Sequence, residues 1–236
     1  NFKLRYWKYD RNSQTLEIEP GYIIKNKLCP KIFGEIKLIY NNENYYLNNI
    51  KRAIKLNYNK ITNKYILCIP FYETSKIRSK TNKIISLDPG LRTFMTGINE
   101  KKTITIGNNV NKIVETDIKR INKIKENKNI KNKIKKKNEI RINRKISNKI
   151  DDLQWKTIKY LTINYDTIFL GDMSSREIVH KENSVLSNTQ RVACLRTKYY
   201  MFQQRLANKC KENGNRYNLI RERYKSKTCS LCVNIK

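Results

Sequence analysis

Acidic residues are scarce in this sequence. Against 51 lysines and arginines stand 20 aspartates and glutamates, so the formal net charge is +31 over 236 residues. An excess of this size favours a polyanion as the partner, because each phosphate that a cation neutralises releases a counterion. An AT-rich genome also enriches lysine, asparagine and isoleucine, yet codon bias alone would not keep the acids so few. We therefore predict nucleic acid as the partner, ahead of an anionic membrane surface.

Long apolar runs and a leader pattern are also missing. No stretch approaches the ~20 consecutive apolar residues of a membrane span, and the opening residues NFKLRY lack the basic, apolar and small-residue regions of a signal peptide. Of the six cysteines only Cys229 and Cys232 are closely spaced, unlike a secreted disulfide framework. We predict an intracellular protein, in the cytoplasm or nucleoid, or in the nucleus if the host is eukaryotic or viral.

The first 80 residues predict a small β-rich domain. Short alternating runs, separated by asparagine, proline and glycine, are TLEIEP (15–20), GEIKLIY (34–40) and YILCIPF (65–71). The face opposite the core would carry lysine and tyrosine, which suits a small basic sheet or an OB-like barrel. An ordinary β domain with solvated lysines fits this segment equally well.

From residue 81 the pattern changes to mixed α/β. Three strands on short connections predict an antiparallel meander, and later strands separated by helices should add in parallel to the first. This predicts a mixed sheet of which the RNase H arrangement is one form, with the first strand beside the strand that follows the helical segment. The predicted elements are strands 83–88, 92–98 and 102–106, helical stretches 112–149 and 153–165, strand 166–173, a polar loop 174–189, a helix with the stripe Val192, Leu195, Tyr199, Phe202 and Leu206 that stops at Gly214, and strand 217–222.

Residues 112–149 surround an apolar stripe with basic side chains. Isoleucine and valine recur at three- and four-residue spacing, which predicts one long helix or a helical hairpin. A charge run is usually a solvated face, but the shortage of acids here favours contact with phosphate. The candidate nucleic-acid-binding residues are Arg92, just after the first strand, and Lys123, Lys128, Lys135, Lys136, Lys137, Arg141, Arg144 and Lys145.

An aspartate ends the first predicted strand. In KIISLDPGLRTFMTG (83–97), Asp88 follows the apolar run 84–87 and precedes Pro89 and Gly90. Ligands of such sheets bind at the carboxyl ends of strands where the chain order reverses. Carboxylates from adjacent strand ends can hold a pair of Mg²⁺ ions for in-line phosphodiester cleavage. An aspartate that serves only as a turn residue before Pro-Gly is the ordinary alternative, and Asp88 alone does not decide between them.

Three motifs together resemble the RuvC-like nuclease core of the TnpB/Fanzor family, which are transposon-encoded, RNA-guided DNA endonucleases related to type V CRISPR effectors. SLDPGLRTFMTG resembles the first catalytic motif, NYDTIFLGDMSSREIV the second, and YKSKTCSLC the start of the zinc ribbon. The resemblance covers about residues 60–236 and is to the Fanzor-like subgroup. It implies a wedge-like nucleic-acid-binding domain at 1–80, a RuvC-like core at 81–225 with a basic helical segment at 107–150, and the first half of a zinc ribbon at 226–236.

The resemblance also implies a role for each matching residue. Asp88 matches the first metal-binding aspartate, whereas the glutamate usual in the second motif is replaced by Gly171. Fanzor-like and some TnpB proteins lack that glutamate and use another one just before the zinc ribbon, which Glu222 matches. Asp172 is the second candidate for this carboxylate. Asp88 and Glu222 would then bind catalytic Mg²⁺, as two ions, together with an aspartate expected further downstream.

Cys229 and Cys232 match half of a four-cysteine zinc ribbon, because structural zinc takes four ligands; Zn²⁺ is expected only if a second CxxC follows. The sequence starts on Asn1 rather than methionine and stops at Lys236, soon after this CxxC, so we expect a fragment. The predicted function is an RNA-guided, metal-dependent DNA endonuclease of a transposable element, with DNA and guide RNA as partners. The alternatives are a catalytically inactive nucleic-acid-binding derivative and an unguided RNase H- or RuvC-type nuclease.

Overall fold

The computed structural model describes residues 13–25, 27–36, 38–40, 43–44, 47, 50–59, 64–71, 74, 81–173 and 186–221. The chain divides into two compact units, Asn1–Glu73 and Thr74–Lys236. Among the described helices, none is both long enough and apolar enough to cross a membrane. Glu222, Cys229 and Cys232 lie outside the described residues.

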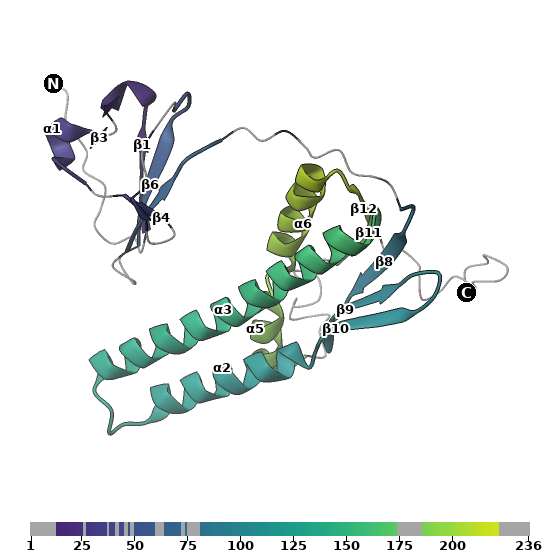
Figure 1. Cartoon of the computed structure of the whole chain (residues 1–236). Coiled ribbons are helices and arrows are strands. Elements are labelled where there is room, and N and C mark those ends of the chain that lie inside the picture. Colours follow the sequence, from purple (N-terminus) through teal and green to yellow (C-terminus); the bar gives the residue numbers. More distant parts are fainter. Residues whose placement is uncertain are drawn as a thin grey trace, which may run out of the picture. The chain divides into compact units, whose positions relative to one another are not determined.

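The first unit is β-rich, as the runs at 15–20 and 65–71 predict (purple to blue in Figure 1). Among the described residues of the run 34–40, only Ile39–Tyr40 form a strand, because Gly34 ends the short helix α1 (Pro30–Phe33). Its main sheet is antiparallel, with the order β1 (Ser13–Ile18), β6 (Ile54–Asn59) and β7 (Lys64–Cys68). Ile18 and Ile54 face each other in this sheet and belong to a small core. Strand β6 was not predicted, because its asparagines suggest a turn. The other elements are η1 (Pro20–Tyr22), β2 (Ile23–Ile24), β3 (Lys27–Leu28), α1 (Pro30–Phe33), β4 (Ile39–Tyr40) and β5 (Glu43–Asn44).

The second unit contains a five-stranded mixed sheet with the order β10-β9-β8-β11-β12. β8, β9 and β10 form an antiparallel meander, β11 runs parallel to β8, and β12 runs parallel to β11. The predicted meander and the predicted pairing of the first strand with the strand after the helical segment are both confirmed. The strands are β8 (Ile84–Pro89), β9 (Thr93–Ile98), β10 (Thr103–Asn108), β11 (Thr167–Asp172) and β12 (Arg216–Arg221).

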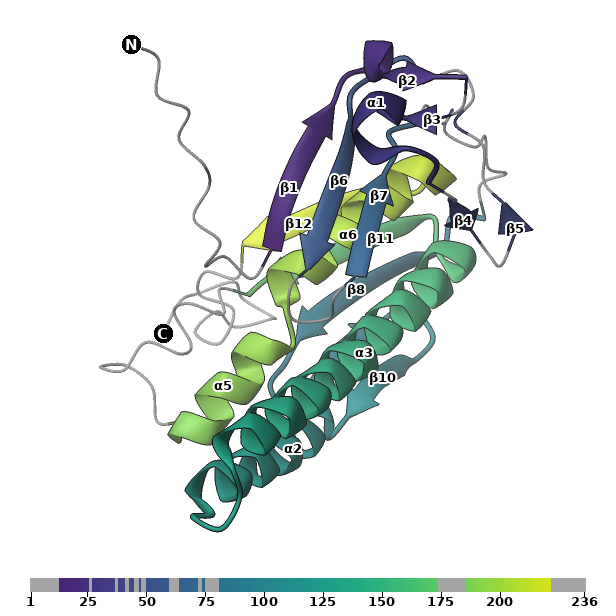
Figure 2. The same ribbon diagram turned by 90° about the vertical axis from the view of Figure 1, so that its left-hand side faces the viewer.

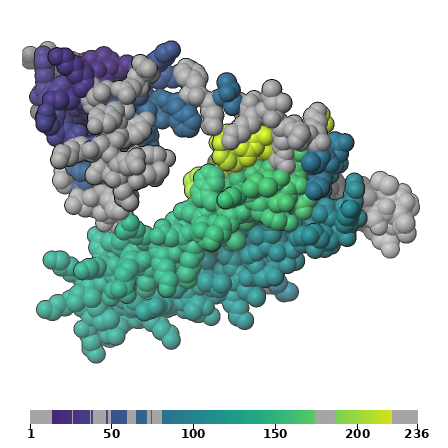
Figure 3. Space-filling view, in the orientation of Figure 1, coloured from purple at the N-terminus to yellow at the C-terminus, as the bar shows by residue number. Residues whose placement is uncertain are grey.

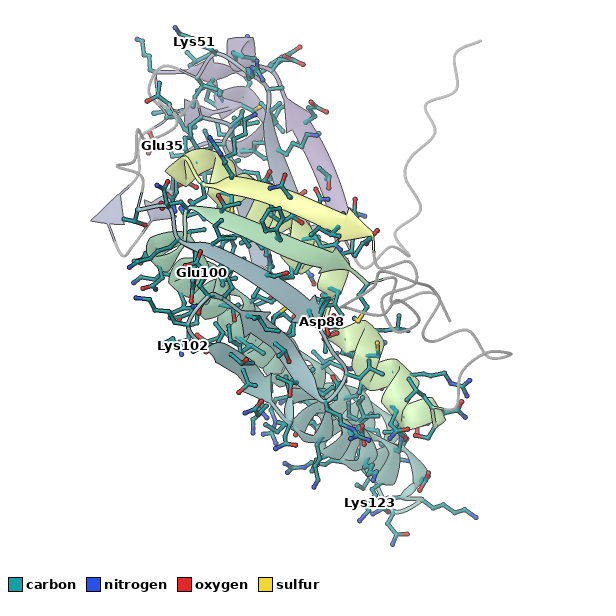
Figure 4. All side chains as sticks on the ribbon, turned by 90° about the vertical axis from the view of Figure 1, so that its right-hand side faces the viewer. Glu35, Lys51, Asp88, Glu100, Lys102 and Lys123 are labelled. Carbon is teal, nitrogen blue, oxygen red and sulfur yellow. The ribbon has the colours of Figure 1, made fainter. Side chains whose placement is uncertain are left out.

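Strand β8 lies in the middle of the sheet, and its side chains alternate between buried and exposed. Ile85 and Leu87 are 0% and 2% exposed, whereas Ile84 and Asp88 are exposed. The described helices of this unit lie on one side of the sheet, and Figure 4 shows the sheet from its other side. The sheet and the helices share one apolar core, which includes the fully buried ring of Phe94.

The basic helical stretch is a hairpin of α2 (Val110–Glu126) and α3 (Asn132–Asn164), which run side by side in Figures 1 and 2. Asn127 ends α2, and its side-chain oxygen accepts a hydrogen bond of 2.9 Å from the N–H of Asn129. This local turn competes with helix continuation. It therefore decides between the one long helix and the hairpin that the sequence allowed. The helix predicted at 153–165 is the end of α3.

The helix predicted from Val192 to Gly214 is wrong in one respect, because two helices occupy this stretch. α5 (Asn188–Arg196) starts with a capping box made by Ser187 and Gln190, and α6 (Tyr199–Asn213) ends at Gly214 in the left-handed conformation, as predicted. Between the helices, Lys198 has a positive φ of 54°. This break turns the start of the predicted stripe outward, so Val192 is 40% exposed.

Candidate functional site

Asp88 lies at the carboxyl end of β8, where the sequence places it. In Figure 4 it is near the tip of the central strand, and β11 beside it and β12 beyond β11 point the same way. β9 and β11 flank β8, so the chain order reverses at Asp88. Ligand sites of open α/β sheets occur at such reversal points. The fold thus presents an exposed carboxylate at the edge where a site is expected.

Gly171 occupies the level of Asp88 on the neighbouring strand. The β8–β11 ladder pairs Leu87 with Leu170, and Asp88 and Gly171 each come one position later. Residues at one level of adjacent parallel strands share a face and lie about 5 Å apart. The carboxylate that is absent from the second motif would therefore have stood at the position of β11 nearest to Asp88.

Asp172 is placed towards the helices. Strand alternation puts it on the side of the buried Leu170, and its Oδ1 accepts a hydrogen bond of 3.3 Å from Gln203 Nε2 of α6. Asp88 lies on the alternate side of its own strand from the buried Leu87. The structure therefore does not bring the two aspartates to one face of the sheet.

The described residues do not by themselves make a metal centre. In the part of the chain that the structure describes, no three His, Cys, Asp or Glu side chains come together. Asp88 offers the hard carboxylate oxygens that Mg²⁺ prefers, but the partner carboxylate has to come from elsewhere. Glu222 is the sequence's candidate, and its role as a ligand, like the zinc-binding roles of Cys229 and Cys232, stays a prediction.

Tyr199 of α6 holds the turn that follows Asp88. Its hydroxyl donates to the carbonyl oxygen of Gly90 and, at 3.3 Å, to that of Phe94, while its ring stacks on the Phe94 ring with 5.3 Å between centroids. Burial raises the pKa of Tyr199, and its electrostatic interactions with Cys194 and Asp88 raise it further, so the hydroxyl stays protonated as a donor. The sequence predicts Tyr199 only as a member of an apolar stripe, and nothing in the pattern signals this second role.

A polar cluster joins α3 to the start of α6. Arg205 donates to Asp151 Oδ1 and to Gln154 Oε1, both at 2.7 Å, and Gln154 donates to the carbonyl oxygen of Thr197 at 2.8 Å. Lys198 Nζ lies 3.5 Å from Asp151 Oδ2. Burial raises the pKa of Asp151, but its bond with Arg205 and the charges of Lys198 and Arg205 outweigh burial and hold the pKa below its usual range. The cluster fixes the helix break, and with it the first turn of α6.

The α2–α3 hairpin carries an outward-facing basic surface. In Figures 3 and 4 its side chains, including the labelled Lys123, project from the far end of the hairpin. Lys135 is half-buried and donates to the carbonyl oxygen of Lys125 at 2.7 Å, so its ammonium also ties the two helices together. The remaining candidates are exposed, namely Arg92, Lys123, Lys128, Lys136, Lys137, Arg141, Arg144 and Lys145.

Two of the few acids of the hairpin are used between its helices. Lys149 Nζ lies 2.9 Å from Asp117 Oδ2, and Lys125 Nζ lies 2.7 Å from Glu139 Oε1. Each pair joins α2 to α3. These carboxylates therefore offset little of the charge on the outer face, which leaves that face suited to a polyanion.

Residues 199–236 match the protein family described as Cas12f1-like, TNB domain. TnpB-like proteins L770 and R854 of Acanthamoeba polyphaga mimivirus are each 30% identical to the chain over 244 residues, covering 100% of the chain and 46% and 45% of their own lengths. TnpB-like protein L79 of the same virus is 28% identical, with 100% and 46% covered. The chain thus spans about half the length of these curated relatives.

Two solved structures are also similar, one of a Cas12f1–sgRNA–target DNA complex and one of a CRISPR–Cas12f ternary complex. Both were determined by cryo-EM. Each has 19% identity and a TM-score of 0.42, with 78% of this chain covered and 39% and 38% of the other chains.

Proposed function

Because this chain belongs to the TnpB-like family, with about 30% identity along its whole length to two members, we propose that it is part of a transposon-encoded, RNA-guided DNA endonuclease. In this proposal the second unit is the RuvC-like core, the first unit is the wedge-like nucleic-acid-binding domain, and Cys229 and Cys232 begin a zinc ribbon. Membership of the Fanzor-like subgroup stays a prediction.

The position of Asp88 carries this proposal. The sheet order is third, second, first, fourth and fifth strand, which supports an RNase H-like arrangement, and Asp88 is the last residue but one of the central first strand. A carboxylate at the reversal point of such a sheet suits phosphodiester cleavage better than a purely structural role. The turn behind it is clamped by Tyr199, so the carboxylate is held on a rigid support.

Asp88 and Glu222 are the proposed ligands of two Mg²⁺ ions. When bound, these ions supply an activated water and offset the negative charge that develops on the phosphate. Ile220 pairs with Gly171, at the level of Asp88, and Glu222 follows Ile220 by two positions in the sequence. Side chains two positions apart in an extended segment share a face, and from this sequence spacing we infer that Glu222, rather than Asp172, is the partner of Asp88.

Metal binding by the purified chain tests these ligands directly. We expect Mn²⁺, followed by its electron paramagnetic resonance signal, to bind to the chain, and Asp88→Asn or Glu222→Ala to weaken binding at least tenfold, about 1.4 kcal/mol. Asp172→Asn is the matched control, because it removes a carboxylate from the same sheet edge on the helix side, and it should bind as the unchanged chain does. Equal binding by the Glu222→Ala variant would remove Glu222 from the site.

The basic hairpin is the proposed contact for the nucleic-acid backbone. Lys137, Arg141 and Arg144 are exposed on α3. Their joint replacement by glutamine should lower the slope of log affinity against log salt by about 2 to 3 for guide RNA or duplex DNA. Lys102→Gln, on the β9–β10 turn labelled in Figure 4, is the control and should leave the slope nearly unchanged. An unaltered slope in the triple variant would exclude this face.

A binding-only derivative of the same fold is the second candidate function, and Gly171 favours it. If the chain retains RNA on purification but binds no Mn²⁺, this candidate takes first place. Bound RNA would at the same time argue against an unguided RNase H- or RuvC-type nuclease.

A further inference from the structure

The loop after Asp88 has its three successive carbonyl groups held by the protein. The oxygen of Gly90 accepts from the Tyr199 hydroxyl, and the oxygen of Leu91 accepts from Asn111 Nδ2. The oxygen of Arg92 accepts from the N–H of Asn109 at 3.0 Å. These donors come from α6, from the first turn of α2 and from the residue before α2, so the loop is fixed from two sides.

Fixing these carbonyls also fixes the direction of the N–H groups that follow them. Every peptide bond described here is trans, and the C=O and N–H of a trans peptide point in opposite directions. The N–H of Leu91 therefore points away from α6, and the N–H of Arg92 points away from α2. Among the described residues, neither N–H group donates a hydrogen bond.

The loop turns so tightly at position 90 that only glycine fits there. A Cβ on Gly90 would lie 2.9 Å from the carbonyl oxygen of Thr93, a distance that real Cβ atoms do not show. The tight turn thus brings the two N–H groups next to the end of β8, beside Asp88.

Two cationic side chains accompany the loop, next to the carboxylate of Asp88. The side chain of Arg92 is exposed, and so is that of Lys112 in the first turn of α2. Asn109, which holds the Arg92 carbonyl, directly precedes α2, so the positive end of that helix dipole is also close. Successive backbone N–H groups in a turn, together with an arginine side chain, are a combination that binds anions.

We propose that residues 90–92 form a phosphate-binding loop, in which the N–H groups of Leu91 and Arg92 and the Arg92 side chain bind a backbone phosphate of the nucleic-acid strand beside Asp88. The inference rests on the proposed function for the identity of the strand. Tyr199 is a positioning residue in this loop, because it holds the Gly90 carbonyl and does not itself contact the phosphate.

The test is a residue-resolved titration of the ¹⁵N-labelled chain with inorganic phosphate in ~150 mM salt. The amide resonances of Leu91 and Arg92 should shift saturably, whereas those near Lys123 should drift without saturation. Arg92→Gln should weaken phosphate binding at the loop about tenfold, the effect of losing one charge-assisted contact. Lys123→Gln, which removes an equally exposed cation from α2, should change it little. Shifts at Leu91 and Arg92 no larger than those along the hairpin would overturn the proposal.

Tyr199→Phe separates positioning from packing. The variant keeps the ring that stacks on Phe94 but releases the Gly90 carbonyl. It should weaken phosphate binding several-fold while the dispersion of the other resonances stays unchanged. Tyr160→Phe, on the exposed side of α3, is the control and should bind phosphate normally. Full phosphate affinity in the Tyr199→Phe variant would contradict the role assigned to the hydroxyl.

Mn²⁺ in a parallel titration distinguishes this loop from the metal function. Broadening of resonances around Asp88 that disappears in Asp88→Asn, without phosphate shifts at Leu91 and Arg92, would overturn the loop and support the metal site. Saturable phosphate shifts without Mn²⁺ broadening would support the loop and count against the proposed metal chemistry.

Discussion

Replacing Gly171 by glutamate returns a carboxylate to the level of Asp88. Gly171 is buried, but it is not among the glycines with positive φ, so its backbone conformation is one that glutamate can adopt. Two carboxylates about 5 Å apart on adjacent strands repel by about 1 kcal/mol at the dielectric constant of water and about 3 kcal/mol at the value typical near a protein surface. Because Asp88 is exposed, water screens the pair, and the lower half of this range is expected.

Without divalent metal, the second unit of the Gly171→Glu variant should melt about 2 to 8 °C below the unchanged chain, at about 2 to 4 °C per kcal/mol for a unit of this size. Mg²⁺ at 100 times its Kd should add about 2.7 kcal/mol to the free energy of unfolding. The melting temperature should therefore recover. Scanning calorimetry in chelator and in Mg²⁺ measures both effects.

Two control variants separate charge from bulk. Gly171→Gln adds the same volume without the charge, and Gly171→Glu combined with Asp88→Asn removes the partner, so neither should gain a strong response to Mg²⁺. If Mg²⁺ raises the melting temperature of the glutamine variant as much as that of the glutamate variant, positions 88 and 171 do not share a metal site.

Three further outcomes are expected. Phe202→Ala, which empties a fully buried site beside the Phe94 ring, should lower the free energy of unfolding by about 3 to 5 kcal/mol, and a loss below about 1 kcal/mol in urea titrations would contradict the core described. Asp151→Ala leaves the cations of its cluster unpaired and should lower the free energy of unfolding by about 1 to 2 kcal/mol, since the carboxylate is 32% exposed. A double-mutant cycle with Arg205→Gln should attribute this loss to the Asp151–Arg205 pair. Burial raises the pKa of Cys210 from 9.0, and that of Tyr217 from 10.0, to about 12. Because both pKa values are raised in the folded state, the stabilisation by the protonated groups is complete below their unfolded pKa values and is lost as pH rises through the folded ones. Urea midpoints should therefore fall between about pH 9 and pH 12, and less so in Cys210→Ala.

The architecture of the second unit could be predicted because it depends on local patterns. Apolar runs such as 84–87 define the strands, and the lengths of the connections decide whether neighbours run antiparallel or parallel. The same reasoning places Asp88 at the reversal point of the sheet, where the structure has it. The level of Gly171 relative to Asp88 needs the register of the ladder, which the sequence does not specify.

Features that depend on distant side chains could not be predicted. The helix break at Thr197 is stabilised by Gln154, which lies on another helix. The clamp on the Gly90 carbonyl comes from Tyr199, whose spacing is that of an ordinary core residue. Such contacts join positions far apart in the chain, and a periodic pattern carries information only about near neighbours.

Because the ion pairs lie between the two helices, the stability of the hairpin and its binding of polyanions depend on different side chains. Asp117 and Glu139 take part in joining the helices, and the side chains of Lys137 and Arg144 point outward. Outer lysines can therefore be gained or lost over generations with little effect on folding. In such a lineage the strength of polyanion binding can drift quickly while the hairpin itself stays intact.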